Sequence, residues 1–485
     1  MEPSDYGLDH ESWRPHQEET VEKILQSDAN TFLLEAPVGS GKTAIAKAVA
    51  SQYSVTALCR TKMLQAANYA GLYQFDALFG RGNYPCALDP TLRGSECEYA
   101  EIGMHKCPQA KACQYLIQKQ VIKDSQARSL NYAYWLVARW PRQEFTEYLF
   151  CDEAHLLSDV VLDFAGTTIQ EKQRRDWNLP PFPVLSSEGQ GVLHQVNVTG
   201  NALAWLETVR KVLLGTYKQL SQAGRDPATL RKLRRCESLG LKVRATISML
   251  KASQSDWFIL SGQRARQVRG PPQPGFVCKP LTARHHAPRL FTNDEWRTVM
   301  MSATIGNQAT FAAELGITQY GGGSTPSPWK AETRPVYCPK DAPRMGRAAM
   351  KRGPAAEEKQ ADIITRILRS VPSNWSGVIH HTSIAGAKRL AALLVQRGFE
   401  DRIWLPPQKM GTEVQLAFWD QQKQRASNSL AITWSWQIGV DLLDERIDIV
   451  AKAPFPSLGS DYERARMRYS GKFYLQRTAW GLEQA

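Results

Sequence analysis

The segment from Ala36 to Thr43 constrains the fold of this chain most, because it reads Ala-Pro-Val-Gly-Ser-Gly-Lys-Thr. An apolar, strand-like run, Thr31–Glu35, precedes it, and a helical pattern, Thr43–Tyr53, follows. Glycines let backbone N–H groups turn towards phosphate oxygens, and the N-terminus of the next helix adds a positive end. The segment departs from the usual phosphate loop only where alanine replaces the first glycine. This succession predicts a nucleotide site on a parallel α/β sheet.

Each residue of this loop would hold a different part of the nucleotide. Gly39, Ser40 and Gly41 would present backbone N–H groups to the phosphates. Lys42 can reach the β- and γ-phosphates, and the Thr43 hydroxyl can complete the ligand shell of Mg²⁺. The alternative is a chance glycine-rich turn before a helix. The strand before the loop and the helix after it favour the nucleotide site.

An acidic tetrapeptide, Asp152-Glu153-Ala154-His155, follows a second apolar strand at Tyr148–Cys151. The end of such a strand is where a nucleotide-bound Mg²⁺ needs a carboxylate. Asp152 would hold the metal directly or through water, Glu153 would position and activate the attacking water, and His155 would couple the site to a second domain. Alone, the tetrapeptide could also be the acidic first turn of a helix. The upstream loop favours the catalytic interpretation.

A chain of 485 residues is too long for one hydrophobic core. A strand at Val299–Ser302 completes the first α/β pattern, and a second pattern opens near Arg334. Its expected elements are strands at Gly377–His381, Leu430–Thr433 and Ile447–Ala451, and a helix at Ile384–Gln396. We expect a first lobe formed by residues 1–79, 128–159 and 259–330, a cysteine-rich insert at 80–127, a mainly helical insert at 160–258, and a second lobe at 331–485.

Four of the nine cysteines lie between the loop and the acidic tetrapeptide, separated by ten, nine and five residues: Cys86, Cys97, Cys107 and Cys113. No signal peptide or membrane span is evident, so we expect a cytoplasmic or nucleoid-associated chain with reduced thiols. Thiolates select zinc or iron–sulfur clusters. Structural zinc usually uses closely paired cysteines, so these spacings fit a [4Fe–4S] cluster better. Zinc, unligated thiols and a ligand role for His105 remain alternatives.

Several other short segments occur in a fixed order along the chain. They are Arg14-Pro15-His16-Gln17, Cys59-Arg60-Thr61-Lys62 with Leu64-Gln65, Ser302-Ala303-Thr304, His381-Thr382-Ser383, and Gly439-Val440-Asp441 with Pro454-Phe455-Pro456. In this order they resemble the Q motif and motifs Ia, III, IV and V of the XPD/DinG family of superfamily-two iron–sulfur helicases. The residues around Cys86 and Cys113 are similar to the flanks of that family's first and last cluster ligands.

The resemblance implies two RecA-like P-loop motor domains, the first carrying an iron–sulfur insert and an arch-like helical insert. It implies ATP hydrolysis with Mg²⁺ between two lobes, 5′-to-3′ translocation on single-stranded DNA and unwinding of forked DNA. The net charge of +13 suits a polyanionic partner. The residues that match nucleotide-binding positions are Arg14, Gln17, Gly439 and Asp441, and those that match strand-binding positions are Arg60, Thr61, Lys62 and Ser383.

Further basic and aromatic side chains could contact a nucleic acid strand. The helical insert carries Arg210, Lys211, Arg231, Lys232, Arg234 and Arg235, and Trp434 and Trp436 flank motif V. Lys and Arg bind phosphates, whereas aromatic rings stack on bases. A solvated helix face would explain the basic residues equally well, and core packing would explain at least one tryptophan.

Motif VI of the family, in which arginines neutralise the transferred phosphoryl group, has no counterpart before Ala485. We therefore expect either a truncated chain or a protein of another class: a nucleotide-gated DNA-binding or redox-sensing module that does not hydrolyse ATP. A DEAH-type RNA helicase is a third interpretation. It shares the motor but leaves the four cysteines unexplained.

Overall fold

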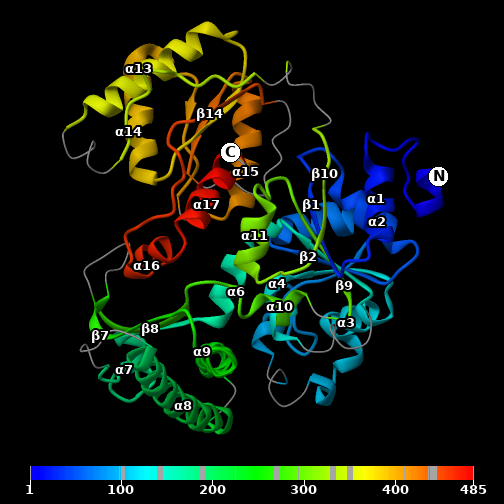
Figure 1. Ribbon diagram of the computed structural model, residues 1–485, viewed down its shortest axis with the longest axis vertical. Helices are drawn as coiled ribbons and strands as arrows, with labels where there is room; N and C mark the ends of the chain where they lie inside the picture. The colour runs from blue at the N-terminus through cyan, green and yellow to red at the C-terminus, as the bar shows by residue number, and fades with distance from the viewer. Residues whose placement is uncertain are drawn as a thin grey trace. The chain divides into compact units, whose positions relative to one another are not determined.

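The computed structural model describes residues 2–97, 99, 104–138, 146–185, 192–223, 226–265, 273–292, 294–327, 332, 335–346, 353–408, 410–434, 436 and 445–483 (Figure 1). The chain forms two compact units. Unit 1 comprises Met1–Pro328 and Ser457–Tyr474, and unit 2 comprises Trp329–Pro456 and Leu475–Ala485. Among the described residues, no helix is both long enough and apolar enough to cross a membrane.

Unit 1 is built on a parallel sheet of seven strands in the order β10-β1-β9-β5-β2-β4-β3. The strands are β1 (Thr31–Glu35), β2 (Val55–Cys59), β3 (Asp76–Leu78), β4 (Ala127–Asn131), β5 (Tyr148–Asp152), β9 (Arg297–Ser302) and β10 (Gly321–Ser324). The predicted strands Thr31–Glu35 and Val55–Cys59 are confirmed with their bounds. Because parallel strands place their carboxyl ends on one edge, the ends of β1, β9 and β5 lie together.

Helices connect these strands, as parallel pairing requires. They are α1 (Gln17–Gln26), α2 (Lys42–Ala50), the π-helix η2 (Leu64–Leu72), α3 (Gln114–Asp124), α4 (Tyr132–Val137), α6 (Leu157–Ala165), α10 (Ala287–Phe291) and α11 (Gln308–Leu315). Short 3₁₀ turns are η1 (Pro3–Tyr6), η3 (Arg81–Asn83), η4 (Gly94–Glu96), η6 (Met104–Lys106), η7 (Ala110–Ala112) and η8 (Ala154–Leu156).

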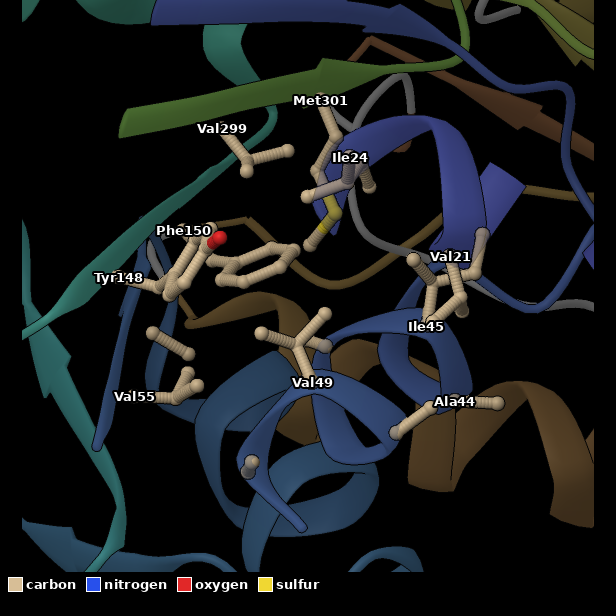
Figure 2. Packing of buried hydrophobic residues seen from close by; sticks show 14 of the residues in the cluster. Val21, Ile24, Ala44, Ile45, Val49, Val55, Tyr148, Phe150, Val299 and Met301 are labelled. Atoms are coloured by element: carbon tan, nitrogen blue, oxygen red, sulfur yellow. The ribbon is translucent and has the colours of Figure 1, made fainter. Parts of the chain in front are cut away.

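One face of the sheet packs on α1 and α2 and forms the main core of unit 1 (Figure 2). Val49 of α2 lies next to Phe150 of β5, Met301 of β9 lies beside Ile24 of α1, and all four side chains are almost completely buried. Strands that are buried on both faces read as continuous apolar runs, which is why these strands could be predicted from the sequence. This packing positions α2, and with it the end of the loop that the sequence predicts to bind phosphate.

Two inserts interrupt the alternation of strands and helices in unit 1. The first, between β3 and β4, carries the four clustered cysteines on short turns before α3. The second lies between α6 and α10 and contains β6 (Thr167–Gln170), α7 (Glu171–Asp176), α8 (Val192–Gln222), α9 (Pro227–Ala252), β7 (Trp257–Ala265) and β8 (Gln273–Pro280). The long helices α8 and α9 pack on each other.

The sequence predicted a mainly helical insert at 160–258, and the structure also contains strands in this part of the chain. Strand β6 lies within that range, and it forms an antiparallel sheet in the order β6-β8-β7. Only four residues of β6 alternate between buried and exposed, which is too short a run to identify a strand by its pattern.

Unit 2 contains a parallel sheet of four strands in the order β12-β13-β11-β14. Its elements are α13 (Ala355–Ser370), β11 (Gly377–His380), α14 (Ile384–Leu394), the π-helix η10 (Val395–Phe399), β12 (Ile403–Trp404), α15 (Thr412–Arg425), β13 (Leu430–Thr433) and β14 (Ile447–Val450). The predicted strand Leu430–Thr433 is confirmed with its bounds.

The last helices are α16 (Asp461–Tyr469) and α17 (Gly471–Glu483). Helix α16 belongs to unit 1, although the sequence suggested a second lobe that runs unbroken over 331–485. Tyr462 explains part of this difference, because its hydroxyl donates to the Pro280 carbonyl at 2.7 Å and its ring contacts Phe258. Helix α16 thus contacts the strands β7 and β8 of the second insert.

Candidate nucleotide site and cysteine cavity

The loop between β1 and α2 has the backbone that a phosphate-binding loop needs. Gly39 and Gly41 have positive φ angles of 86° and 79°, which glycine adopts at no steric cost. A Cβ atom on Gly41 would lie 1.9 Å from the side-chain nitrogen of Gln17. The Lys42 ammonium donates to the Ala36 carbonyl at 2.9 Å. Ala36, at the position of the usual first glycine, is fully buried in the core, so its methyl group is accommodated by packing.

Two residues of the predicted Q motif donate hydrogen bonds to the backbone of this loop. The Gln17 amide donates to the Ser40 carbonyl at 3.0 Å and accepts from the Arg14 backbone N–H at 2.8 Å. The Arg14 guanidinium donates to the Gly39 carbonyl at 2.5 Å. Gln17 is buried, so its side chain packs against the loop and is not a solvated position on the helix surface. The contacts of both residues are with the loop backbone.

Asp152 ends β5 and is almost completely buried. The Tyr69 hydroxyl donates to its Oδ2 at 3.1 Å, and the Glu153 backbone N–H donates to its Oδ1 at 2.9 Å. Burial raises the pKa of Asp152, and the positive charge of Lys42 opposes this effect. A buried carboxylate held by neutral donors and facing a lysine is a suitable ligand for a divalent cation.

Glu153, the next residue, has a left-handed backbone with φ 53° and ψ 45°. This conformation costs a non-glycine residue about 1 kcal/mol or more, and such strain is concentrated at functional sites. The ring of His155 links Glu153 to β9, because its Nδ1 lies 3.4 Å from Glu153 Oε2 and 2.8 Å from Ser302 Oγ. The Ser302 hydroxyl also accepts from the Thr304 backbone N–H at 3.2 Å. The acidic tetrapeptide and the Ser302–Thr304 segment therefore form one connected network.

The four clustered cysteines line one small cavity, together with Ala87, Gly94 and Met104. Cys86, Cys97 and Cys113 are buried, and Cys107 is partly exposed. Burial raises the pKa of the Cys97 thiol to about 11, and the neighbouring Cys86 and Cys107 thiols act in the same direction. His105 is exposed and does not line the cavity. Within the described ranges, no group of three or more His, Cys, Asp or Glu side chains is placed to hold a metal ion.

The strand-binding candidates lie at the ends of strands. Arg60 and Lys62 are exposed just after β2, and Thr61 accepts from the Leu64 backbone N–H through its hydroxyl at 3.2 Å. Ser383 caps α14, where its hydroxyl accepts from the Gly386 N–H at 3.2 Å. Gly439 and Asp441, predicted to contact nucleotide, lie outside the described residues.

The two tryptophans near motif V differ in exposure. Trp436 is buried, contacts Trp404 and Trp419, and donates its indole N–H to the Gln415 side chain at 3.0 Å. It packs in the core and cannot stack on a base. Trp434 is only partly buried at the edge of the unit 2 core.

Comparison with known proteins reveals similarity in structure alone. No protein-family model and no curated protein matches the sequence. A solved structure of an XPD helicase matches with a TM-score of 0.56 and 14% identity, over 97% of this chain and 92% of that chain. A structure of apo XPD matches with a TM-score of 0.53 and 13% identity, over 97% and 91% of the two chains.

The fold of the chain, with its parallel α/β sheets, is similar to the fold of these two XPD structures. The α/β class and the parallel sheets expected from the sequence are confirmed. Sequence reasoning did not identify Tyr69 as a partner of Asp152. The two residues are 83 positions apart, and no local pattern indicates such a contact.

Proposed function

We propose that this chain is an ATP-driven helicase motor that moves 5′-to-3′ along single-stranded DNA and separates forked duplexes. The main support for this proposal is that three of the predicted site segments lie at the same edge of the parallel sheet in unit 1. The phosphate loop follows β1, the acidic tetrapeptide follows β5, and β9 with Ser302 lies between these two strands. This is the edge at which open α/β sheets bind their ligands.

The residues of unit 1 have separate roles in the proposed reaction. The loop N–H groups and Lys42 hold the phosphates of ATP, and Thr43 and Asp152 hold Mg²⁺. Bound Mg²⁺ neutralises negative charge on the β- and γ-phosphates. Glu153 orients a water molecule and takes its proton as the water attacks the γ-phosphorus, and the bond to the β,γ-bridging oxygen breaks. His155 holds Glu153 in place through its contact with Ser302.

The DNA strand is held by exposed basic and hydroxyl groups in the proposed mechanism. Arg60, Thr61 and Lys62 bind phosphates on unit 1, and Ser383 binds them on unit 2. The helical insert adds exposed basic side chains: Arg210, Lys211, Arg231, Lys232 and Arg235. Phosphate contacts of this kind give an affinity that falls steeply with salt concentration.

The four cysteines would hold a [4Fe–4S] cluster. The support is that four thiols from a single insert line one cavity, and that Cys97 lies close enough to Cys86 and Cys107 to raise its pKa. A cubane binds its four thiolates at separate iron corners, so the sulfurs lie farther apart than the ligands of one zinc ion. Such thiols need not form a single-ion site. The cluster would cross-link the short turns of the first insert, which contain little regular structure, and would hold them in the shape of a wedge that separates the duplex.

An unwinding assay tests the proposed function and its direction. A forked DNA with only a 5′ tail should be separated in the presence of ATP and Mg²⁺, whereas a fork with only a 3′ tail should not. Lys42→Ala serves as the inactive control. Equal separation of both forks would refute the direction. ATP-dependent changes in DNA affinity without strand separation would favour the nucleotide-gated binding module, and preferential action on RNA would favour the RNA helicase.

A further inference from the structure

Tyr69 is a fully buried tyrosine that lies between the proposed strand-binding segment and the proposed Mg²⁺ site. It lies on η2, the helix that begins directly after the Arg60–Lys62 segment. Its hydroxyl donates to the Asp152 carboxylate at 3.1 Å. A single helix therefore begins directly after the proposed strand-binding residues and contacts the proposed Mg²⁺ ligand about one turn later. The ring of Tyr69 packs edge-on against Phe75, at 5.2 Å between centroids.

Helix η2 is a π-helix of nine residues. π-helical segments are rare and occur frequently at functional sites. Its first turn is fixed by Gln65, whose buried side chain donates to the Leu78 and Ser129 carbonyls at 3.2 and 2.8 Å. Its end is fixed where the Phe75 backbone N–H donates to the Tyr69 carbonyl at 2.9 Å. The Gln65 backbone N–H also donates to the Thr61 carbonyl at 3.2 Å, so η2 is joined directly to the Arg60–Lys62 segment and a rearrangement of that segment acts on the helix that carries Tyr69.

A second buried tyrosine also contacts Asp152, but it binds a different group of that residue. The Tyr132 hydroxyl donates to the main-chain carbonyl of Asp152 at 2.6 Å and is also buried. Tyr132 thus holds the end of strand β5, whereas Tyr69 holds the carboxylate itself. The Glu153 N–H occupies one site on Oδ1. An ionised carboxylate accepts about four hydrogen bonds or metal contacts in total, so sites for a metal remain.

We infer that Tyr69 is a positioning residue through which a bound DNA strand regulates the nucleotide site. The inference rests on the proposed function. A phosphodiester backbone bound at Arg60–Lys62 holds η2 in the arrangement in which the Tyr69 hydroxyl orients the Asp152 carboxylate towards Mg²⁺. Outer-shell partners of this kind typically affect metal affinity or activity by about 10- to 100-fold. Linkage requires that Mg²⁺–ATP strengthens strand binding by the same factor by which the strand strengthens Mg²⁺–ATP binding.

The test is Tyr69→Phe, which keeps the ring and removes only the hydroxyl. We measure the affinity for a Mg²⁺-bound, non-hydrolysable ATP analogue with and without a single-stranded oligonucleotide, and the Mg²⁺ concentration for half-maximal binding. The variant should need about tenfold more Mg²⁺ and should lose the effect of the strand on analogue binding. Its affinity for the strand alone should be unchanged. Tyr73→Phe, at the end of the same helix, should behave like the unmodified protein.

Four results would overturn the inference. Tyr69→Phe could keep both the Mg²⁺ dependence and the effect of the strand, which would reduce Tyr69 to packing. Tyr132→Phe could abolish the effect of the strand equally, which would assign it to general loosening of β5. The unmodified protein could bind analogue and strand independently, which would refute the coupling and leave nucleotide binding intact. An unmodified protein that binds no Mg²⁺-bound analogue refutes the proposed function itself, and the inference with it.

Discussion

Replacing Arg466 by methionine should destabilise unit 1 strongly, because this arginine is buried and carries several charged contacts. Its guanidinium donates to Asp159 at 2.9 Å and to the Ser158 hydroxyl at 3.4 Å, and it lies 3.7 Å from Glu314. Its side chain is 6% exposed, that of Glu314 is 6% exposed and that of Asp159 is 31% exposed. The variant leaves two carboxylates without their counter-charge.

The expected loss follows from these exposures. Breaking a buried ion pair costs about 3–5 kcal/mol, but water screens the partly exposed Asp159. Glu314 also keeps hydrogen bonds from the Ser158 and Thr282 hydroxyls. We therefore expect a loss of about 2–4 kcal/mol in the free energy of unfolding. In a unit of this size, this corresponds to a fall in Tm of roughly 3–6 °C.

Thermal unfolding of the full chain, followed by tryptophan fluorescence, measures the effect. Arg464→Met is the matched control, because Arg464 lies on the same helix and pairs locally with Asp461 and the Leu458 carbonyl. It should cost less than about 1 kcal/mol. Adding Asp159→Asn to Arg466→Met should cost little more, because the pair is already broken. If Arg466→Met lies within about 0.5 kcal/mol of the unmodified protein, the account of how α16 docks on unit 1 is wrong.

Three further predictions concern other buried groups. Burial lowers the pKa of His286 to about 4. As the pH falls, the unfolded chain therefore binds a proton at this histidine before the folded chain does, and the free energy of unfolding decreases between pH 6.5 and pH 4. His286→Phe should remove about 2 kcal/mol of the decrease in the free energy of unfolding between pH 7 and pH 5, measured by urea unfolding. Ser302→Ala removes the contact with His155 and should slow DNA-stimulated ATP turnover about tenfold, with ATP affinity unchanged. Cys113→Ser should lower the iron content and visible absorbance of anaerobically purified protein, whereas substitution of the buried Cys236, far along the chain, should not. A colourless, iron-free unmodified protein that is folded and active would refute the cluster.

The parallel sheets could be predicted because their strands are continuous apolar runs between helical patterns. Strands β1, β2 and β13 begin and end where the sequence indicated. Strand β6 was missed because its alternation covers four residues. Helix α16 was assigned to the second lobe because it follows that lobe in the chain. Arg466 could not indicate otherwise, since its partner Asp159 lies 307 positions earlier.

The parts of the candidate site that could be predicted are those in which the functional residues are consecutive in the sequence. The phosphate loop and the acidic tetrapeptide are of this kind. The bracing of the loop by Gln17, the left-handed backbone of Glu153 and the contact of Tyr69 with Asp152 were not predictable. These features depend on distances between segments that are remote in sequence, and they arise only after the sheet has formed.

The most direct test of the central claim is ATP hydrolysis by this chain with and without single-stranded DNA, compared with Glu153→Gln. The unmodified protein should hydrolyse ATP faster when DNA is present. Glu153→Gln should bind Mg²⁺–ATP with similar affinity but hydrolyse it at least about 100-fold more slowly. The account would be contradicted if both proteins bound nucleotide and DNA but turned over ATP at the same rate, or if neither hydrolysed it at all.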